Sequence, residues 1–294
     1  VRDYLNLPIM AEDEGTQRVK PAPTTEPDPT EPELTAKRSL KAAEEKVDFV
    51  ELQSGLDGAE KSIINAYKTI QARQVSTLVT LGMKAIRSGD VDKLEGITVP
   101  LKQKASDMIA RELTALFRKG QNSVEREAIS AGMPTIRMAS PLDPEDDRAV
   151  VGFLRSRAAM ISSVLSERLR ASLLRNGLDM IRRGEPDGKE LGKTLRQLSD
   201  RDIRREVKLS TSESLNLGRQ SFAKMNADFV REVVYSSVLD EGTCDPCTSA
   251  DGETFGIDSG EADRLAVPLE ACEGNSRCRC VHVYTFTTED TPRG

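Results

Sequence analysis

Hydrophobic residues recur three, four or seven positions apart over much of the chain, with charged residues between them. This period places the apolar side chains on one face of a helix, so the pattern predicts long amphipathic helices that pack as a bundle. Gly89 and Gly184 interrupt the pattern and mark helix ends. Five helices are predicted in this way, over about residues 57–88, 101–129, 150–183, 189–198 and 200–226.

Near the C-terminus the pattern changes to short runs of β-branched and aromatic residues, at 231–238 and 279–286. These runs have the length and composition of strands, and we expect the two to pair antiparallel. Asp251-Gly252 is typical of a tight turn, and a short middle strand is expected over 254–257. The predicted fold class is therefore mainly α: a bundle of long helices with a small C-terminal antiparallel β module that binds zinc, for the reasons given below.

The composition changes sharply before the first helix. Residues 11–36 hold five prolines, seven acidic residues and two basic ones, with almost no apolar residue. Because so little apolar surface is available to bury, this composition predicts an extended, disordered linker. The chain is then expected to divide into a fragment of a preceding element (1–10), the linker (11–36), a helical region (37–139), a second helical body (140–228) and the β module (229–294).

Charge is distributed unevenly. Residues 37–239 hold 35 basic and 28 acidic residues, a net charge of +7, whereas residues 240–294 hold 4 and 12, a net charge of -8. The helical part therefore permits nonspecific contact with DNA, although no element that would read bases is visible. Aromatic residues make up 4% of the chain, which predicts an aliphatic core suited to helix packing. No run reaches the length of about 18 apolar residues that predicts a membrane span, so we expect no membrane partner.

Four of the five cysteines stand in two tight pairs, Cys244 with Cys247 and Cys278 with Cys280. The single histidine of the chain, His282, follows two residues after the second pair. Zinc takes four nitrogen or sulfur ligands in a tetrahedron, and a Cys-x-x-Cys turn lets one loop supply two of them. The pattern therefore predicts one zinc ion held by four thiolates, or by three thiolates and the imidazole.

The fourth ligand stays open at this point. Along a regular strand Cys278 and Cys280 lie about 6 to 7 Å apart, so both reach one ion only where the backbone curls between them. Without that curl, Cys272 or His282 would complete the set. Disulfides are the alternative to a metal site, but five cysteines leave one thiol over and no signal peptide predicts an oxidising compartment.

Motifs for catalysis are missing from the sequence. It contains no Gly-x-Ser-x-Gly, no glycine-rich phosphate loop and no His-Glu-x-x-His. A hydrolytic zinc site would need an open coordination position and a general base, for which Glu253 and Glu273 are the candidates. We therefore predict that the protein is not an enzyme, and a zinc-dependent enzyme is the alternative.

The C-terminal cysteine motifs also carry a resemblance. Residues 244–255 (CDPCTSADGETF), followed by Cys-Arg-Cys at 278–280, resemble the signature of the phage Mu F-like minor head proteins, also called head morphogenesis proteins. Residues 212–219 (SESLNLGR) are similar to the helix of that family, which reads Arg-Thr-Glu and then Asn-x-Gly-Arg. Asn275-Ser276 stand where the family has His-Pro, so one candidate ligand of the family is missing here.

This resemblance implies a structural protein of a tailed phage or prophage. The expected protein is a minor capsid component of the virion head, present in the host cytoplasm during assembly, that contacts portal and capsid proteins in head assembly or in DNA packaging and ejection. Residues 1–10 are similar to the segment that closes some phage portal proteins, and they also fit an arbitrary helix end. The alternative is a carrier module of a phage-borne toxin, but only eight residues follow Phe286, so we expect no toxin domain.

Overall fold

The structure, a computed structural model, describes residues 47–134, 138–197, 200–237, 243–274 and 278–287. The segments expected at 1–10 and 11–36 lie outside these residues. Within the described part, helices account for most of the chain, and the strands gather near the C-terminus. The predicted class, mainly α with a small antiparallel β module that contains a cysteine cluster, is confirmed.

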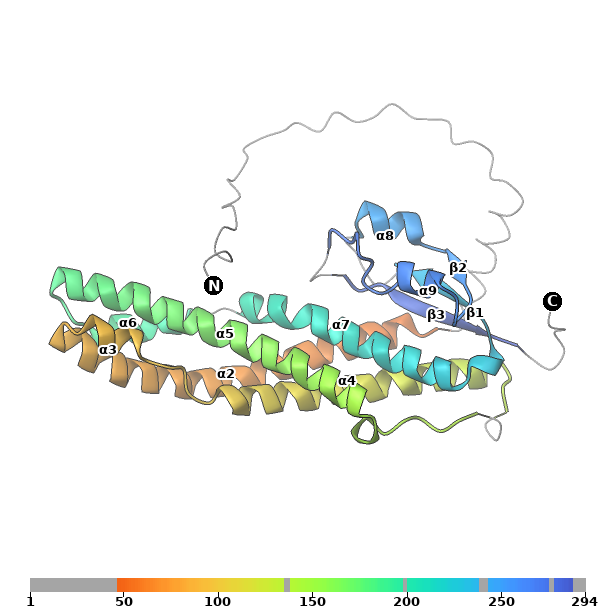
Figure 1. Ribbon diagram of the computed structural model, residues 1–294, viewed down its shortest axis with the longest axis horizontal. Helices are drawn as coiled ribbons and strands as arrows, with labels where there is room; N and C mark the ends of the chain where they lie inside the picture. Colours follow the sequence, from red (N-terminus) through yellow and green to blue (C-terminus); the bar gives the residue numbers. More distant parts are fainter. Residues whose placement is uncertain (1–46, 135–137, 198–199, 238–242, 275–277, 288–294) are drawn as a thin grey trace, which may run out of the picture.

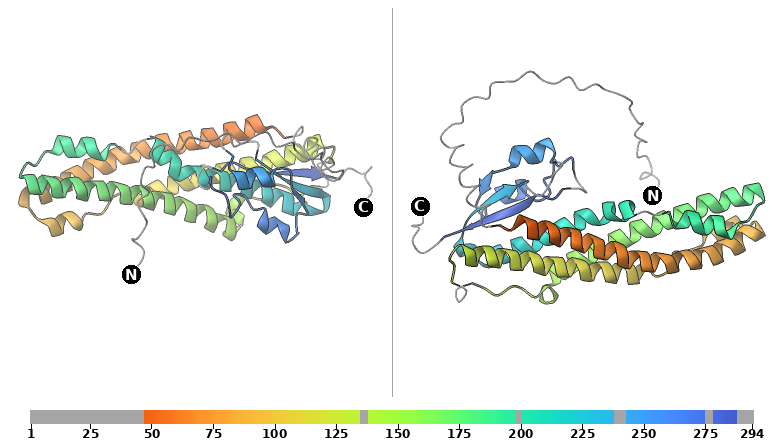
Figure 2. Two further views of the ribbon diagram at one scale, coloured as in Figure 1. Left: turned by 90° about the horizontal axis from the view of Figure 1, so that it is seen from above. Right: turned by 180° about the vertical axis from the view of Figure 1, so that it is seen from behind.

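Long helices form an elongated body (Figure 1). α2, α4, α5 and α7 pack side by side in the part of this body that lies next to the sheet. The shorter helices α3 and α6 pack on α2 and α5 at the end remote from the sheet (Figure 2). The helices of the body are α2 (Phe49–Ser88), α3 (Val91–Glu95), α4 (Lys102–Ser130), α5 (Arg148–Arg183), α6 (Gly188–Leu195) and α7 (Asp200–Met225).

The C-terminal module contains an antiparallel sheet in the order β2-β1-β3. β1 (Val230–Ser236) is central, and its register with β3 (Val281–Phe286) sets Tyr235 opposite His282. The run expected as a middle strand is β2 (Thr254–Phe255), which has two residues and lies at the edge. Short helical turns lie in the connections: η2 (Pro144–Asp146), η3 (Ala227–Phe229), α8 (Asp245–Ala250) and α9 (Glu261–Arg264).

Local side chains set the helix boundaries. The carboxylate of Asp48 accepts a hydrogen bond from a backbone N–H three residues on, so α2 begins eight residues before the start that the apolar pattern predicted. Asp147 caps α5 in the same way. Gly89 and Gly184 end α2 and α5 with φ of 63° and 70°, the left-handed conformation that favours glycine.

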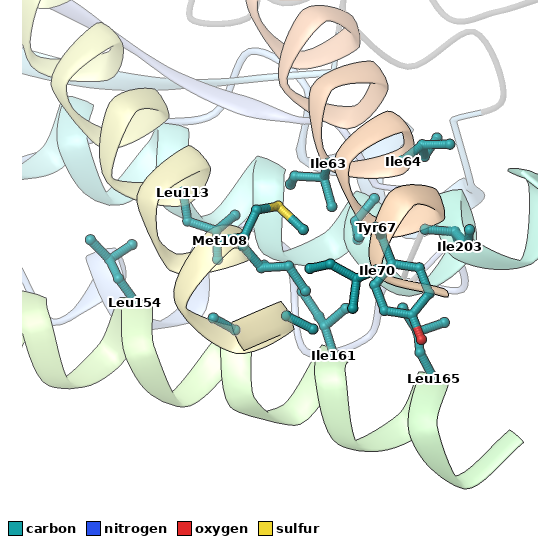
Figure 3. Close-up of a cluster of buried hydrophobic side chains, with 14 of the residues drawn as sticks. Ile63, Ile64, Tyr67, Ile70, Met108, Leu113, Leu154, Ile161, Leu165 and Ile203 are labelled. Atoms are coloured by element: carbon teal, nitrogen blue, oxygen red, sulfur yellow. The ribbon is translucent and has the colours of Figure 1, made fainter. Parts of the chain in front are cut away.

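The apolar core crosses the boundaries expected at residues 139 and 228. One cluster in the middle of the bundle joins side chains of α2, α4, α5 and α7, among them Ile63, Leu113 and Ile161 (Figure 3). Another cluster joins the sheet to the helices, so the helical body and the β module do not have separate cores. It contains Val234, Val281 and Val283 of the strands and Leu56, Leu116 and Leu215 of the helices.

Two glycines allow α4 and α7 to approach each other closely. A β-carbon on Gly120 would lie 2.2 Å from the carbonyl oxygen of Leu215, and one on Gly218 would lie 2.0 Å from that of Phe117. Backbone atoms of the opposite helix fill this space, so a side chain at either position would push the helices apart. Gly218 belongs to the Asn-x-Gly-Arg segment, whose asparagine and arginine side chains donate to the backbone of Cys280 and His282.

By length and composition alone, α5 has a window apolar enough to cross a membrane. Of this 18-residue window, 39% is buried, and the apolar residues Leu154, Ile161 and Leu165 lie in the bundle core. A core helix passes the same test, so one such helix is weak evidence for a membrane span.

Candidate metal centre

The five cysteines lie on three segments of the C-terminal module. Cys244 precedes α8, and Cys247 lies within it. Pro246 favours a helix here, because it fixes φ near the helical value and has no N–H that would need a partner in the first turn. The sequence predicted a turn here, and the structure has a helix of six residues. The other three cysteines are Cys272, after α9, and Cys278 and Cys280, just before β3.

The thiols assemble into two groups of three that share Cys247. One group is Cys244, Cys247 and Cys272; the other is Cys247, Cys278 and Cys280; within each group the Sγ atoms lie within 4.8 Å of one another. The Sγ atoms of Cys244 and Cys272 are 3.8 Å apart, and all five cysteines are free thiols. Sulfurs bound at about 2.3 Å to one tetrahedral zinc ion lie about 3.8 Å from one another, so these clusters can hold a metal ion.

Burial makes a cation necessary if these thiols ionise. Cys247, Cys278 and Cys280 are at most 1% exposed, and the cluster packs against Val124 of α4 and Phe222 of α7. Thiolates in such an environment are strongly destabilised unless a positive charge is close to them. A bound metal ion would supply that charge.

The thiols differ in how readily they lose a proton. Burial opposes ionisation of Cys244, but hydrogen bonds from the backbone N–H groups of Gly274 and Cys247 outweigh it and lower the pKa to about 7. Burial raises the pKa of Cys247 to about 12. Hydrogen bonding with Cys280, together with burial, raises the pKa of Cys278. A metal ion has to displace the protons of the buried thiols, so its affinity is expected to rise with pH.

The hydroxyl of Tyr235 supports the cluster from the sheet side. It donates a hydrogen bond to Sγ of Cys247 at 3.4 Å, and burial raises its pKa, so it remains a donor. A donor to a metal-bound sulfur fixes the orientation of that ligand. Tyr235 is therefore positioned to orient the one thiol that both groups share.

The sulfurs of the two cysteines that flank Arg279 lie closer together than side chains two residues apart on a regular strand. β3 begins only at Val281, and the Sγ atoms on either side of Arg279 belong to the same group. The Arg279 side chain leaves the cluster and donates to Asp57 (3.0 Å) and Glu60 (2.7 Å) of α2. Burial raises the pKa of Glu60, and the charge of Arg279 opposes this shift. Arg279 thus ties the cysteine segment to the helical body.

His282 does not join either thiol group. Its Nε2 lies 2.7 Å from the carbonyl oxygen of Leu265, its ring packs edge-on to Phe255, and burial lowers its pKa to about 4. It stands one strand repeat, about 7 Å, beyond Cys280. Of the predicted ligands, the structure therefore places Cys278 and Cys280 with Cys247 in one group and Cys244 with Cys247 in the other. Cys272, one of the open candidates for the remaining ligand, belongs to the second group, and His282 belongs to neither.

Sequence reasoning missed Arg219 of α7, which is fully buried. Its guanidinium bonds to both carboxylate oxygens of Glu127, at 2.6 and 3.0 Å, and donates to the carbonyl oxygen of His282 at 2.9 Å. Asn216, one turn earlier, donates to the carbonyl oxygen of Cys280 at 3.1 Å. The Asn-x-Gly-Arg segment thus holds the backbone of β3 and of the cysteine segment before it.

The two buried ion pairs, Arg279 with Glu60 and Arg219 with Glu127, each leave a signal in the sequence. Glu60 lies on the apolar face of its helix, four residues after Leu56 and three before Ile63, and Glu127 follows Val124 by three. A carboxylate within an apolar stripe indicates a buried cationic partner, because an unpaired buried charge is rare. The apolar face of the helix does not indicate which residue is the cationic partner, because in each case the partner lies on a distant segment of the chain.

Loss of the Glu127 carboxylate is expected to lower the free energy of unfolding by about 3 to 5 kcal/mol, because it leaves Arg219 charged and buried without its partner. Glu127→Ala makes this change. Glu125→Ala, on the same helix and without an ion pair in the described residues, should change stability by less than about 0.5 kcal/mol. Urea unfolding followed by circular dichroism compares the two, and equal stabilities would contradict a structural role for the pair.

The candidate bases of a catalytic site lie outside the thiol groups. Glu253 forms an ion pair with Arg264 at 2.5 Å, and the side chain of Glu273 is exposed. In the described residues, the groups that can hold a metal consist of cysteines alone. Sulfur ligands of this kind favour zinc and other thiophilic ions over magnesium or calcium.

Comparisons with protein-family models, with curated proteins and with solved structures find no match for this chain.

Proposed function

We propose that this protein is a structural component of a tailed-phage or prophage head. In this proposal it is a minor capsid protein of the Mu F-like kind, which contacts portal and capsid proteins and acts in head assembly or in DNA packaging and ejection. The observation that carries the proposal is the buried thiol cluster, in which the Cys-x-x-Cys and Cys-Arg-Cys motifs of the resemblance meet at Cys247. Zinc is the proposed ion, because the sulfur spacing fits its tetrahedral shell.

The site supports a role in stabilisation more than one in catalysis. A small sheet has little core of its own and needs an additional constraint, which a structural metal supplies. A zinc ion with four thiolates has no open coordination position at which a substrate or water molecule could be activated. Arg279 and Arg219 connect the same segment to α2, α4 and α7, so the metal would fix the module on the bundle.

Nonspecific DNA contact is part of the proposal. An open groove of about 1280 Å³ between α4 and α5 has four arginines and two acidic residues in its lining: Arg111, Arg118, Arg148, Arg155, Asp107 and Glu145. Arg118 pairs with Asp143, whereas the other three arginines form no ion pair within the described residues. Unpaired arginines along a groove favour contact with phosphates whatever the base sequence.

Particle assembly tests the proposal. Cys247→Ser should reduce incorporation of the protein into heads and its co-purification with the portal protein, because the module loses its metal. Glu253→Gln and Glu273→Gln should leave particle formation, infectivity and zinc content unchanged, because neither carboxylate has a part in a stabilising site. A Glu273→Gln or Glu253→Gln protein that assembles normally and retains zinc, yet abolishes infectivity, would make a catalytic site the better account.

A further inference from the structure

The set of helices that forms the helical body changes part of the way along its length. α2 and α5 run through both parts, whereas α4 begins only at Lys102 and α7 only at Asp200 (Figures 1 and 2). The half next to the sheet, the proximal half, is built from α2, α4, α5 and α7. The distal half is built from α2, α3, α5 and α6. Two continuous helices therefore connect the halves.

The apolar core is divided at the same level. The cluster of the proximal half has its last members at Ile70 on α2 and Leu165 on α5. The cluster of the distal half has its first members on these helices at Val75 and Leu169. About one helical turn on each continuous helix thus separates two apolar clusters.

Buried polar residues lie between the two clusters and along the adjoining edge of the proximal one. Gln74 donates to the carbonyl oxygen of Pro100 at 2.8 Å, and Ser162 donates to that of Lys102 at 2.7 Å, so both contact the segment in which α4 begins. Figure 3 shows the hydroxyl of Tyr67 extending from α2 towards α5, beside Leu165. These residues form a polar layer, defined as Tyr67, Gln71, Gln74, Ser162 and Ser166, each at most 6% exposed.

Four polar atoms of this layer have no hydrogen-bond partner in the described residues: the Tyr67 hydroxyl, Gln71 Nε2, Gln74 Oε1 and Ser166 Oγ. Buried polar groups are nearly always paired, and an unpaired one destabilises the packed state relative to a state that water reaches. The connection at this level is also strained, because Leu101 has a φ of 60°, which residues other than glycine rarely adopt.

We propose that the polar layer is a hinge at which the distal half of the body bends relative to the proximal half. Bending here admits water to unpaired polar atoms, which gain hydrogen bonds, instead of exposing apolar side chains. Only α2 and α5 run across the layer, because α3 and α6 belong to the distal half and α4 and α7 belong to the proximal half. The elongated body can then change shape while the thiol cluster and the sheet keep their packing on the proximal half.

Hydrogen exchange on the full-length, metal-loaded chain tests the hinge. Backbone amides of residues 67–75 in α2 and 162–169 in α5 should exchange at least about tenfold faster than those of the same helices two turns away on either side. Exchange that is uniform along both helices, or slowest at the polar layer, would overturn the proposal.

A variant tests whether the unpaired polar groups are the cause. Gln71→Met combined with Ser166→Ala replaces two of them with apolar groups of similar shape, so exchange at the layer should slow by about tenfold. Ser76→Ala, at an exposed position of α2, is the matched control and should leave exchange unchanged. Unchanged exchange in a folded double variant would overturn the proposal. If the double variant does not fold, the exchange profile of the unsubstituted chain decides the question.

Discussion

Replacing Cys247 with serine is expected to remove the metal and to unfold the C-terminal module. Cys247 is the one thiol that belongs to both groups of three, so its loss leaves only two sulfurs in each group. Structural zinc sites in small modules contribute about 10 to 16 kcal/mol of apparent binding free energy at neutral pH, so the loss should far exceed that of an ordinary core substitution. Metal analysis after gel filtration and thermal unfolding measure the two effects.

The effect is also expected to reach the helices that the sheet covers. Val234, Val281 and Val283 pack against Leu56 and Leu116, so unfolding of the module exposes the proximal end of the bundle. Part of the helical circular dichroism should therefore be lost together with the metal. Thr248→Ser, at an exposed position of α8, is the matched control and should keep both metal and stability. A Cys247→Ser protein with full metal content and an unchanged melting temperature would contradict the metal site.

Adding a single methyl group at Gly218 is expected to destabilise the protein by more than about 3 kcal/mol, because the new atom would overlap backbone of the opposite helix. The β-carbon of Gly218→Ala would lie 2.0 Å from the carbonyl oxygen of Phe117, and no side-chain rotation relieves that contact. α4 and α7 would have to separate, which would draw Arg219 away from Glu127 and from β3. Urea unfolding measures the change in the free energy of unfolding.

Gly152→Ala is the control for Gly218→Ala. Gly152 lies inside α5, and a β-carbon there would meet nothing within 4 Å. Alanine is favoured over glycine inside a helix by about 1 kcal/mol, so this variant should be as stable as the unsubstituted chain or more so. If both alanine variants are equally stable, the close packing of α4 on α7 is wrong.

Much of the fold could be predicted because local rules determine it. The spacing of apolar residues locates the long helices. Gly89 and Gly184 mark helix ends, because the backbone there adopts the left-handed conformation that favours glycine. The start of α2 was predicted too late, because the capping side chain of Asp48 adds nothing to the apolar spacing from which the helix was predicted. α8 was predicted as a turn, although Pro246 suits the first turn of a helix as well as it suits a turn.

The composition of the thiol cluster could be predicted only in part. Cys244 and Cys247 are neighbours in sequence, so their spacing predicts a shared site. The choice between Cys272 and His282 depends on where the chain after α9 folds back, and no local pattern fixes that path. His282 instead lies against Leu265, a contact between segments 17 residues apart. Arg219 was missed for a similar reason, because its partner Glu127 is on another helix.

X-ray absorption at the zinc edge, measured on the full-length purified protein, tests the central claim most directly. A site built from the cysteine cluster predicts a first shell of sulfur alone, with four sulfurs at about 2.3 Å and no nitrogen. The spectrum should be the same when His282 is replaced by phenylalanine, because the imidazole lies outside both thiol groups. A shell that includes nitrogen or oxygen at about 2.0 to 2.1 Å, or a protein that retains no zinc, would contradict the claim.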